Sequence, residues 1–578
     1  MSIDRNQMWC ALGADVDVLV IGGGITGVGV ARDAAMRGLK VALVEQEDLA
    51  YGTSSRSSKL IHGGLRYLEH YEFGLVFESV SERQVLQRLA PHLVRPLGFL
   101  FPIYKHSRQK LWLLRAGMWL YDGLSLFRSY KSHRTLRPLK VAELEPALLQ
   151  SDLVGAPLYY DCATDDARLT IETALDAAER GAVIVTRCCA QALLRNDHGQ
   201  VEGARVLDRL TGATKEVRAR VVVNATGPWT DAVLALDKEK HRPLLRPTKG
   251  VHIVFDYDRL PIQHAVVCFH PEDERVLFAI PWGDRTYVGT TDTDFQGEPG
   301  SEHATAEDVQ YLLDASNAYF PELDFRAEDV LSTWAGLRPL IAPPPKDGSV
   351  DESSVSREHE VLVGTDGLIS IVGGKLTTYR LMSAETVDAA IKQMGAHAEL
   401  PQRGSSSTGK ESLPGAKDWP EEGGLAVVAE RIAAAGAPHV ALDTAELFAS
   451  TYGTRGISVA KRCLEHPELA ARLVPGRPEI LAQVDEAVQH EFATGVSDIL
   501  IRRTQLFFRD RNQGLGAAPG VAARLQAILG WDEARCQSEI EAFQAEVALS
   551  RRFRSEPKAA RAEQPTARAD QRAARVAE

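Results

Sequence analysis

The sequence predicts an α/β protein with a dinucleotide-binding domain, an antiparallel sheet layer and a C-terminal helical domain. Three stretches lead to this fold class: a strand–glycine–helix–strand unit at 16–45, strand-like runs separated by turns at 241–345, and mostly helical patterns at 418–554. At 578 residues the chain is too long for one hydrophobic core, so two or three domains are expected. Its 44% hydrophobic and 25% charged residues are typical of a soluble globular protein.

The unit at 16–45 has the features of a Rossmann-like nucleotide site. An apolar run at 16–21 predicts a buried parallel strand, and glycines, helical spacing and a second apolar run follow it. Gly22 permits the tight turn, Gly24 lets the backbone approach a pyrophosphate, and Gly27 lets the helix pack closely on the strand. Glu45 ends the second run and can accept a hydrogen bond from a ribose hydroxyl. A ligand with an ADP moiety is therefore expected, the alternative being a glycine-rich turn inside an α/β core.

Three later stretches are expected to complete this site. The segment 51–68 is rich in small and hydroxylated residues, which suits a backbone lying against a flat ligand, although a flexible surface loop has the same composition. A buried strand at 221–223 ends in a small-residue turn with Gly227, and this turn would form a second wall. At 368–380 a strand, the pair Gly373-Gly374 and a helix start again predict an anion-binding helix N-terminus.

Charge and cysteine usage exclude several classes of protein. The net charge of −12 argues against generic nucleic-acid binding. The seven cysteines include no CxxC pair, so we expect reduced thiols in a cytosolic compartment and no metal site. Residues 1–15 lack an apolar signal core and are expected to be a short disordered lead. The sequence contains no run of about twenty uncharged apolar residues, so no membrane-spanning helix is expected.

The segment 104–140 interleaves basic residues with Trp, Leu and Phe. Such a surface is typical of a helix lying in a membrane interface, with its rings at the headgroups and its cations on anionic lipid. The alternative is an ordinary amphipathic helix packed on its domain, because Arg115 and Asp122 interrupt the apolar residues.

Shifts in composition predict the domain boundaries. The dinucleotide-binding domain would comprise 16–240 with 346–395, and it would enclose a substrate-binding region at 241–345. A Ser/Gly-rich linker at 403–417 leads to the helical domain at 418–554. The tail at 555–578 has almost no apolar bulk and is expected to be disordered.

A series of long motifs runs in order over about residues 16–390. They are IGGGITG, TSSRSSKLIHGGLRYLEHYEF, YDCATDDARL, VVNATGPW, PTKGVHIV, IPWGDRTYVGTTDTDF, WAGLRPL, SREHEV and GGKLTTYR. Together they resemble the FAD-dependent, membrane-associated glycerol-3-phosphate dehydrogenases. The resemblance implies bound FAD and a fold of the glutathione-reductase and amino-acid-oxidase type. The cofactor-binding residues that it implies are Gly22, Gly24, Gly27, Glu45, Thr53, Ser54, Ser55, Lys59, His62, Gly63, Gly64, Gly227, Gly373, Gly374, Lys375, Leu376 and Thr377.

The same resemblance indicates how a phosphorylated substrate would be held. A glycerol phosphate dianion needs fixed cations, preferably Arg, whose fork matches two phosphate oxygens at a time. The candidates in family-matching motifs are Arg66, Arg338, Arg357 and Lys375, with Tyr67 beside them. For any one arginine, a surface ion pair is the alternative.

Oxidation of the C2 alcohol also requires removal of its hydroxyl proton as the hydride leaves. His252 is the candidate base, because His titrates near the working pH. His62 is the alternative base, and a buried structural role is open for both histidines. Arg338 could instead stabilise the developing alkoxide.

The resemblance implies oxidation of sn-glycerol 3-phosphate to dihydroxyacetone phosphate by hydride transfer to FAD, with electrons passed to a membrane quinone. The protein would then be cytoplasmic and peripheral on the cytoplasmic face of the inner membrane, docked on anionic lipid through 104–140. The C-terminal domain would pack against the flavoprotein body or pair subunits into a homodimer. Two alternatives are an oxidase that uses dioxygen and a nucleotide-binding scaffold or regulatory protein.

Overall fold

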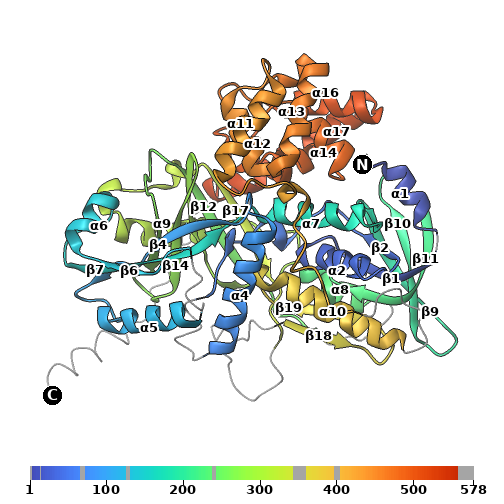
Figure 1. The fold of residues 1–578 in the computed structure, drawn as a ribbon, viewed down its shortest axis with the longest axis horizontal. Helices are drawn as coiled ribbons and strands as arrows, with labels where there is room; N and C mark the ends of the chain where they lie inside the picture. The colour runs from blue at the N-terminus through green and yellow to red at the C-terminus, as the bar shows by residue number, and fades with distance from the viewer. Residues whose placement is uncertain are drawn as a thin grey trace.

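The computed structural model describes residues 3–13, 15–64, 72–124, 130–236, 243–342, 359–395 and 404–556. Within these ranges two large sheets lie side by side, one of eight strands and one of eleven. The C-terminal helices lie across the top of both sheets in the view of Figure 1. No helix in the described ranges is both long and apolar enough to cross a membrane.

The first sheet contains the strand–helix–strand unit predicted at 16–45. Its strand order is β18-β19-β11-β1-β2-β8, and β10 joins β11 to β9. The pairs from β19 to β8 are parallel, whereas β18, β10 and β9 pair antiparallel with their neighbours. The strands are β1 (Val16–Ile21), β2 (Val41–Val44), β8 (Val183–Val185), β9 (Cys188–Arg195), β10 (Val201–Asp208), β11 (Thr214–Asn224), β18 (His359–Val363) and β19 (Ile369–Gly373).

Both faces of this sheet are covered, which explains the nearly continuous apolar character of β1 and β2. On one face, α2 (Ile25–Met36) contacts α7 (Asp166–Glu179) and α10 (Tyr379–Met394). Val18, Val20 and Leu43 point into the core that these helices share. On the other face, Leu19 and Val222 pack against residues of β9 and β10.

The second sheet is the largely antiparallel layer that the sequence predicts for 241–345. Its strand order is β16-β12-β15-β14-β13-β4-β7-β3, with β17 on β12 and with β5 and β6 on β7. The strands are β3 (Leu60–Ile61), β4 (Arg95–Leu100), β5 (Ile103–Tyr104), β6 (Arg134–Leu136), β7 (Leu153–Ala163), β12 (Thr248–Asp256), β13 (Ala265–Phe269), β14 (Val276–Trp282), β15 (Arg285–Gly289), β16 (Thr293–Asp294) and β17 (Ser332–Arg338).

The expected assignment of all of 16–240 to the dinucleotide-binding domain does not hold for β3 to β7. These strands belong to the second sheet, because β4 pairs in parallel with β13 and β7 pairs antiparallel with β4. The apolar run of β4 thereby extends the sheet beyond β13, whose other neighbour is β14. The second sheet therefore draws strands from two separate parts of the chain.

The two faces of the second sheet pack against different helices. Along β12, Ile253 and Phe255 face a core shared with α9 (Ala306–Tyr319). Val254, and Trp334 on β17, face the C-terminal helices. The other helices of this part of the chain are α4 (Phe73–Leu89), α5 (Leu111–Leu124), α6 (Pro138–Leu144) and α8 (Thr230–Leu234).

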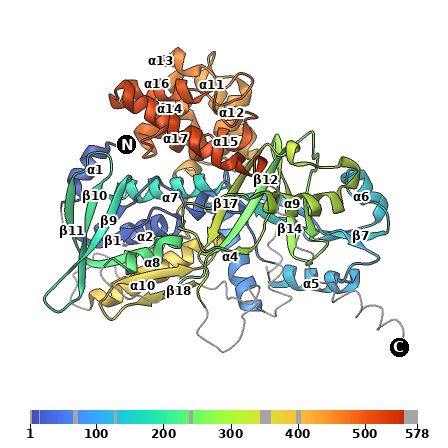
Figure 2. The ribbon, with the colours of Figure 1, turned by 180° about the vertical axis from the view of Figure 1, so that it is seen from behind.

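The C-terminal third is helical, as the sequence predicts (Figure 2). Its helices are α11 (Gly424–Gly436), α12 (Leu442–Tyr452), α13 (Gly456–Glu465), α14 (Ala482–His490), the π-helix η10 (Asp498–Arg503), α15 (Leu506–Arg509), α16 (Ala518–Leu529) and α17 (Glu533–Arg551). The helices α11 to α13 have a core of their own. The elements from α14 to α17 share a core with the second sheet, so this half of the region packs directly on that sheet.

The expectation of a disordered lead is wrong for residues 5–11, which form α1 (Arg5–Ala11). The Asp4 carboxylate caps this helix by accepting hydrogen bonds from the N–H groups of Asn6 and Gln7. Arg5 pairs with Asp208 at 2.7 Å and donates to the Thr186 carbonyl. The helix is stable in this place because it is tied to β10 and to the end of β8.

The expected linker at 403–417 is packed against the body over its described part. Arg32 on α2 donates to the carbonyl oxygens of Thr408, at 3.0 Å, and Glu411, at 2.8 Å. Leu413 is fully buried in the core of the first sheet. The segment connects two regions but does not separate them. Of the expected disordered tail, residues 557–578 lie outside the described residues.

Candidate cofactor and substrate site

The turn between β1 and α2 has the shape that the glycine motif predicts. Gly22 has φ +111°, and an added Cβ there would stand 2.6 Å from the Ala225 carbonyl oxygen. An added Cβ on Gly27 would overlap the Gly22 carbonyl oxygen. Gly24 is the N-cap residue of α2, and Ser54 Oγ accepts the Ile25 N–H at 2.9 Å. Gly22 and Gly27 exclude side chains, so the backbone can lie close to a ligand here.

Glu45 lies buried beside this turn. Its carboxylate accepts the N–H groups of Gly23, at 2.6 Å, and Glu47, at 2.7 Å. Burial raises the pKa of Glu45 to about 7, although the two backbone hydrogen bonds oppose the shift. A ribose hydroxyl donating to this carboxylate would stabilise its charged form.

The predicted second wall lies against the segment that follows Glu45. Gly227, with φ +54°, begins the short helix η2 (Gly227–Trp229) at the end of β11. An added Cβ on Gly52 would stand 2.8 Å from the Trp229 ring. The predicted residues Thr53, Ser54 and Ser55 form the next short helix, η1 (Thr53–Ser55). The structure therefore brings the two walls together.

The third predicted wall meets the stretch 59–64. The Thr377 hydroxyl accepts the His62 N–H and donates to the His62 carbonyl, both at 3.2 Å. Gly373 and Gly374 have φ of +72° and +85°, and η6 (Leu376–Thr378) follows them. Gly63 donates its N–H to Asp161, and an added Cβ there would overlap the Tyr121 hydroxyl. The stretches that contain Gly22 to Gly27, Gly52 to Gly64, Gly227, and Gly373 with Gly374 therefore form the walls of one candidate cofactor site.

On the substrate side, His252 and Arg338 lie on paired strands, β12 and β17. The His252 ring stacks on Trp334, and its Nε2 is 2.9 Å from the Ser58 hydroxyl. It is 3% exposed, and its Nδ1 has no hydrogen-bond partner among the described residues. Burial, with smaller contributions from the charges of Arg338 and Lys59, holds the pKa of His252 well below its usual value. The imidazole is therefore neutral at neutral pH.

Arg338 is partly exposed, with 24% of its side chain accessible. Its guanidinium contacts Asp292 at 2.8 Å and the Thr290 hydroxyl at 3.1 Å. It lies over Gly250, where an added Cβ would stand 2.6 Å from Nη2. The neighbouring Leu337 carbonyl accepts the Thr53 hydroxyl at 2.6 Å, so Arg338 is next to the cofactor-side helix η1.

The Lys59 side chain forms a buried ion pair and does not offer its charge as a cofactor-binding group. Its ammonium is buried, pairs with Asp166 at 2.6 Å and donates to the Ser55 carbonyl at 3.2 Å. It also lies over the rings of Trp282, Trp334 and Phe508, with its Nζ 5.5 to 5.8 Å from their centroids. The contribution of Lys59 to a site would come from its backbone. Asp166 lies in the motif YDCATDDARL but is not among the predicted site residues, and Phe508 belongs to a region without a recognised motif.

The other phosphate-binding candidates are only partly within the described chain. Lys375 directly precedes η6, and Arg66, Tyr67 and Arg357 lie outside the described residues. All seven cysteines are free thiols. The described residues contain no group of three or more His, Cys, Asp or Glu side chains that could hold a metal ion.

Comparisons with known proteins agree with this arrangement. A sequence model described as FAD dependent oxidoreductase matches residues 17–380, and a second, described as C-terminal domain of alpha-glycerophosphate oxidase, matches 406–536. The match over residues 17–380 defines the chain as an FAD-dependent oxidoreductase, which confirms the predicted cofactor and fold class.

Full-length relatives identify the family within this class. Glycerol-3-phosphate dehydrogenase 2 of Mycobacterium tuberculosis is 41% identical over 94% of this chain and 90% of its own length. The aerobic glycerol-3-phosphate dehydrogenase of Staphylococcus haemolyticus is 35% identical over 93% of this chain and 94% of its own. The solved structure of the Bacillus halodurans glycerol-3-phosphate dehydrogenase, complexed with FAD, has a TM-score of 0.78 and 32% identity, covering 96% of this chain and 99% of that one. The chain belongs to the glycerol-3-phosphate dehydrogenase family.

Proposed function

We propose that this chain oxidises sn-glycerol 3-phosphate to dihydroxyacetone phosphate, passing a hydride to FAD and the electrons on to a membrane quinone. One observation carries the proposal: the glycine walls and the His252–Arg338 pair meet through hydrogen bonds. Ser58 and Thr53 both lie on the cofactor side. The Ser58 hydroxyl is hydrogen bonded to His252, and the Thr53 hydroxyl donates to the Leu337 carbonyl on the strand that carries Arg338. The names of the relatives indicate that the substrate is glycerol 3-phosphate.

The residues around the β1–α2 turn fit the ADP end of FAD. Gly22 and Gly27 leave no room for side chains, and Glu45 offers a buried carboxylate for a ribose hydroxyl. The N-terminus of α2 supplies a partial positive charge for the pyrophosphate. Bound FAD supplies the hydride acceptor. The walls at 53–55, 59–64, 227 and 373–377 would surround the rest of the cofactor.

Arg338 is suited to bind the substrate or to stabilise charge that develops on it. Asp292 and Thr290 fix the direction of the guanidinium before any ligand arrives, so little reorganisation is needed when an anion binds. Its partial exposure leaves room for a phosphate or an alkoxide to approach. Lys375, and the candidates at 66, 67 and 357, would complete the phosphate site.

His252 is the proposed proton acceptor, and its surroundings limit what it contributes. Its neutral imidazole is the form that accepts a proton, but a base with a strongly lowered pKa has little driving force for doing so. Its Nε2 is already hydrogen bonded to Ser58. Electrostatic stabilisation by Arg338 therefore accounts for more of the proposed catalysis than proton abstraction by His252.

The helix α5 supports docking on a membrane. Trp112, Leu113, Trp119 and Leu120 are exposed, the two tryptophans by 70% and 60%, whereas Met118 and Tyr121 on the same helix are buried. An ordinary amphipathic helix would bury its apolar side chains, whereas an interfacial helix presents them to lipid. In both overall views α5 lies on the side opposite the C-terminal helices (Figures 1 and 2). A peripheral place on the inner membrane would bring the flavin close to quinone.

Anaerobic reduction of the purified holoprotein tests the proposal. Adding sn-glycerol 3-phosphate should bleach the yellow flavin, whereas unphosphorylated glycerol should not. Turnover that needs a quinone analogue supports the dehydrogenase, and rapid peroxide formation in air would indicate the oxidase instead. A flavin that stays oxidised with saturating substrate would leave the nucleotide-binding scaffold as the better description.

A further inference from the structure

The loop between β2 and η1, residues 45–50, lies directly against the glycine turn. It is attached to Gly23 at both ends: Glu45 accepts the Gly23 N–H, and the Ala50 N–H donates to the Gly23 carbonyl at 3.1 Å. An added Cβ on Gly23 would stand 2.9 Å from both Glu45 and Leu49. We refer to residues 45–50 as the ribose loop. The position of this loop sets the position of the Glu45 carboxylate.

The middle of the ribose loop is held from the far end of the chain. Asp48 is fully buried, and its carboxylate accepts hydrogen bonds from Arg502 and Arg503 on η10. Arg503 also reaches the other carboxylate oxygen of Asp48 at 2.9 Å. Both arginines are themselves at most 3% exposed. The charge of Asp48 is thus compensated from the C-terminal region, about 450 positions away in sequence.

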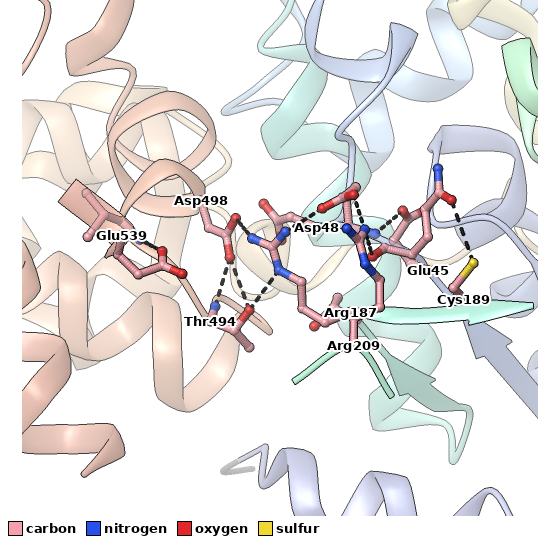
Figure 3. A network of polar contacts seen from close by, with 12 residues as sticks. Glu45, Asp48, Arg187, Cys189, Arg209, Thr494, Asp498 and Glu539 are labelled. Atoms are coloured by element: carbon pink, nitrogen blue, oxygen red, sulfur yellow. Dashed lines mark hydrogen bonds and ion pairs between the residues drawn. The ribbon is translucent and has the colours of Figure 1, made fainter. Parts of the chain in front are cut away.

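A second set of ion pairs runs beside this one. Arg187 pairs with Asp498 of η10 at 2.7 Å (Figure 3). It also pairs with Glu47 of the ribose loop at 2.6 Å. Asp498 also pairs with Arg502 at 2.7 Å. Burial disfavours the charged form of Asp498, but the guanidiniums of Arg187, Arg502 and Arg503 outweigh it and hold its pKa well below the usual value. The network is continuous from the ribose loop to η10.

We propose that η10 retains the cofactor: Arg502 and Arg503 hold the ribose loop on Gly23, so that docking of the C-terminal region sets the affinity for FAD. Both arginines are positioning residues, because they act on the cofactor through Asp48 and Glu45. A purely structural ion pair would stabilise the fold to the same degree with and without FAD. The proposal instead requires that breaking the pair weakens FAD binding itself.

The variant Asp48→Asn tests this in the full-length holoprotein, because it keeps the size of the side chain and removes its charge. Release of FAD after dilution is followed by the rise of free-flavin fluorescence. Coupling between distant sites is typically 5- to 150-fold, so we expect FAD to bind roughly tenfold more weakly. We also expect FAD to raise the melting temperature of the variant by less than it raises that of the parent protein.

The matched control is Asp485→Asn, which breaks a two-point pair with Arg524 between α14 and α16, inside the C-terminal region. It should lower the melting temperature of the apoprotein and the holoprotein equally and leave FAD release unchanged. If Asp48→Asn fails to fold, Arg502→Lys keeps the charge, loses the fork and should still speed FAD release. Unchanged FAD release in the folded variant overturns the proposal. Because FAD binding is measured without substrate, this outcome is independent of which alcohol the enzyme oxidises.

Discussion

His252 lies flat against Trp334 across the β12–β17 ladder, with ring centroids 4.7 Å apart and 14° between the ring planes. An added Cβ on Gly289 would overlap the other side of the imidazole. The ring is therefore fixed by packing, whereas 24% of the Arg338 side chain on the facing strand is accessible. This difference in accessibility separates the roles of the two residues.

Replacing Arg338 should impair catalysis more than replacing His252. Loss of one preorganised donor to a developing oxyanion typically costs about 100- to 1,000-fold in rate, and we expect a fall of that size in kcat/KM for Arg338→Lys. For His252→Gln we expect a smaller fall. Steady-state kinetics with a quinone analogue provide the measurement. Arg246→Lys is the control, because Arg246 also forms an ion pair on this sheet, with Asp294. The reverse order of the two effects would make His252 the base.

The variant Gly27→Ala should lose the cofactor. Its added methyl group would overlap the Gly22 carbonyl oxygen, so α2 must move away from the turn that receives the pyrophosphate. The ratio of flavin to protein absorbance after purification measures the loss. Gly74→Ala on α4 is the matched control, since nothing lies within 4 Å of the added methyl group and Ala favours a helix. Full flavin content in Gly27→Ala would contradict the proposed place of the pyrophosphate.

The apoprotein should lose stability as the pH rises from about 4.5 to about 7. Burial raises the pKa of Glu45 from 4.5 to about 7, so in this range the folded state binds a proton that the unfolded state has released. Such a shift corresponds to about 3 kcal/mol between the two ends of the range. Urea unfolding of the apoprotein at several pH values measures it. In Glu45→Gln this part of the pH dependence should disappear, and an identical slope in the variant would exclude Glu45 as its source.

The variant Lys59→Met should lower the free energy of unfolding by about 3–5 kcal/mol, because removing one partner of a buried ion pair leaves Asp166 uncompensated. Denaturant unfolding of the holoprotein checks this value. Lys105→Met is the control, because Lys105 pairs with Asp152 on the exposed surface and should contribute little. Equal effects of the two substitutions would argue against the buried charge of Asp166.

Removing the aromatic side chains from α5 should weaken membrane binding. We expect Trp112→Ser with Trp119→Ser to reduce sedimentation with vesicles that contain anionic lipid, because both rings are exposed and suited to the headgroup region. Turnover with a water-soluble quinone analogue should stay unchanged. The control is Leu442→Ser with Leu529→Ser, which alters exposed apolar side chains of the C-terminal helices. Sedimentation equal to that of the parent protein would exclude α5 as the docking surface.

Much of the first sheet could be predicted from the sequence because its signals are local. The turn at Gly22, the helix that follows and the strand before Glu45 depend on neighbouring residues, and all three form as predicted. The strands β12, β14 and β15 could be predicted for the same reason, from the strand-like runs within 241–345, whereas no such run indicated β13.

The remaining features depend on partners that are distant in sequence. Nothing near Lys59 indicates that its charge will pair with Asp166, and nothing near Asp48 indicates two arginines about 450 positions later. β4 belongs to the second sheet because it pairs with β13, which lies more than 150 residues later in the chain. In the candidate site, the backbone walls were therefore easier to predict than the ion-pair partners of the charged side chains.

The interleaving of the two sheets constrains how this protein is synthesised. A nascent chain that has reached residue 240 already contains β4 and β7, which pair with each other, but β13, the other partner of β4, has not yet been made. It also contains β11, which still lacks β19. Unpaired strand edges are templates for aggregation, and domains complete their folding only when all their parts have emerged from the ribosome. The last strands of the two sheets, β17 in the second and β18 and β19 in the first, therefore emerge close together in time, within residues 332–373.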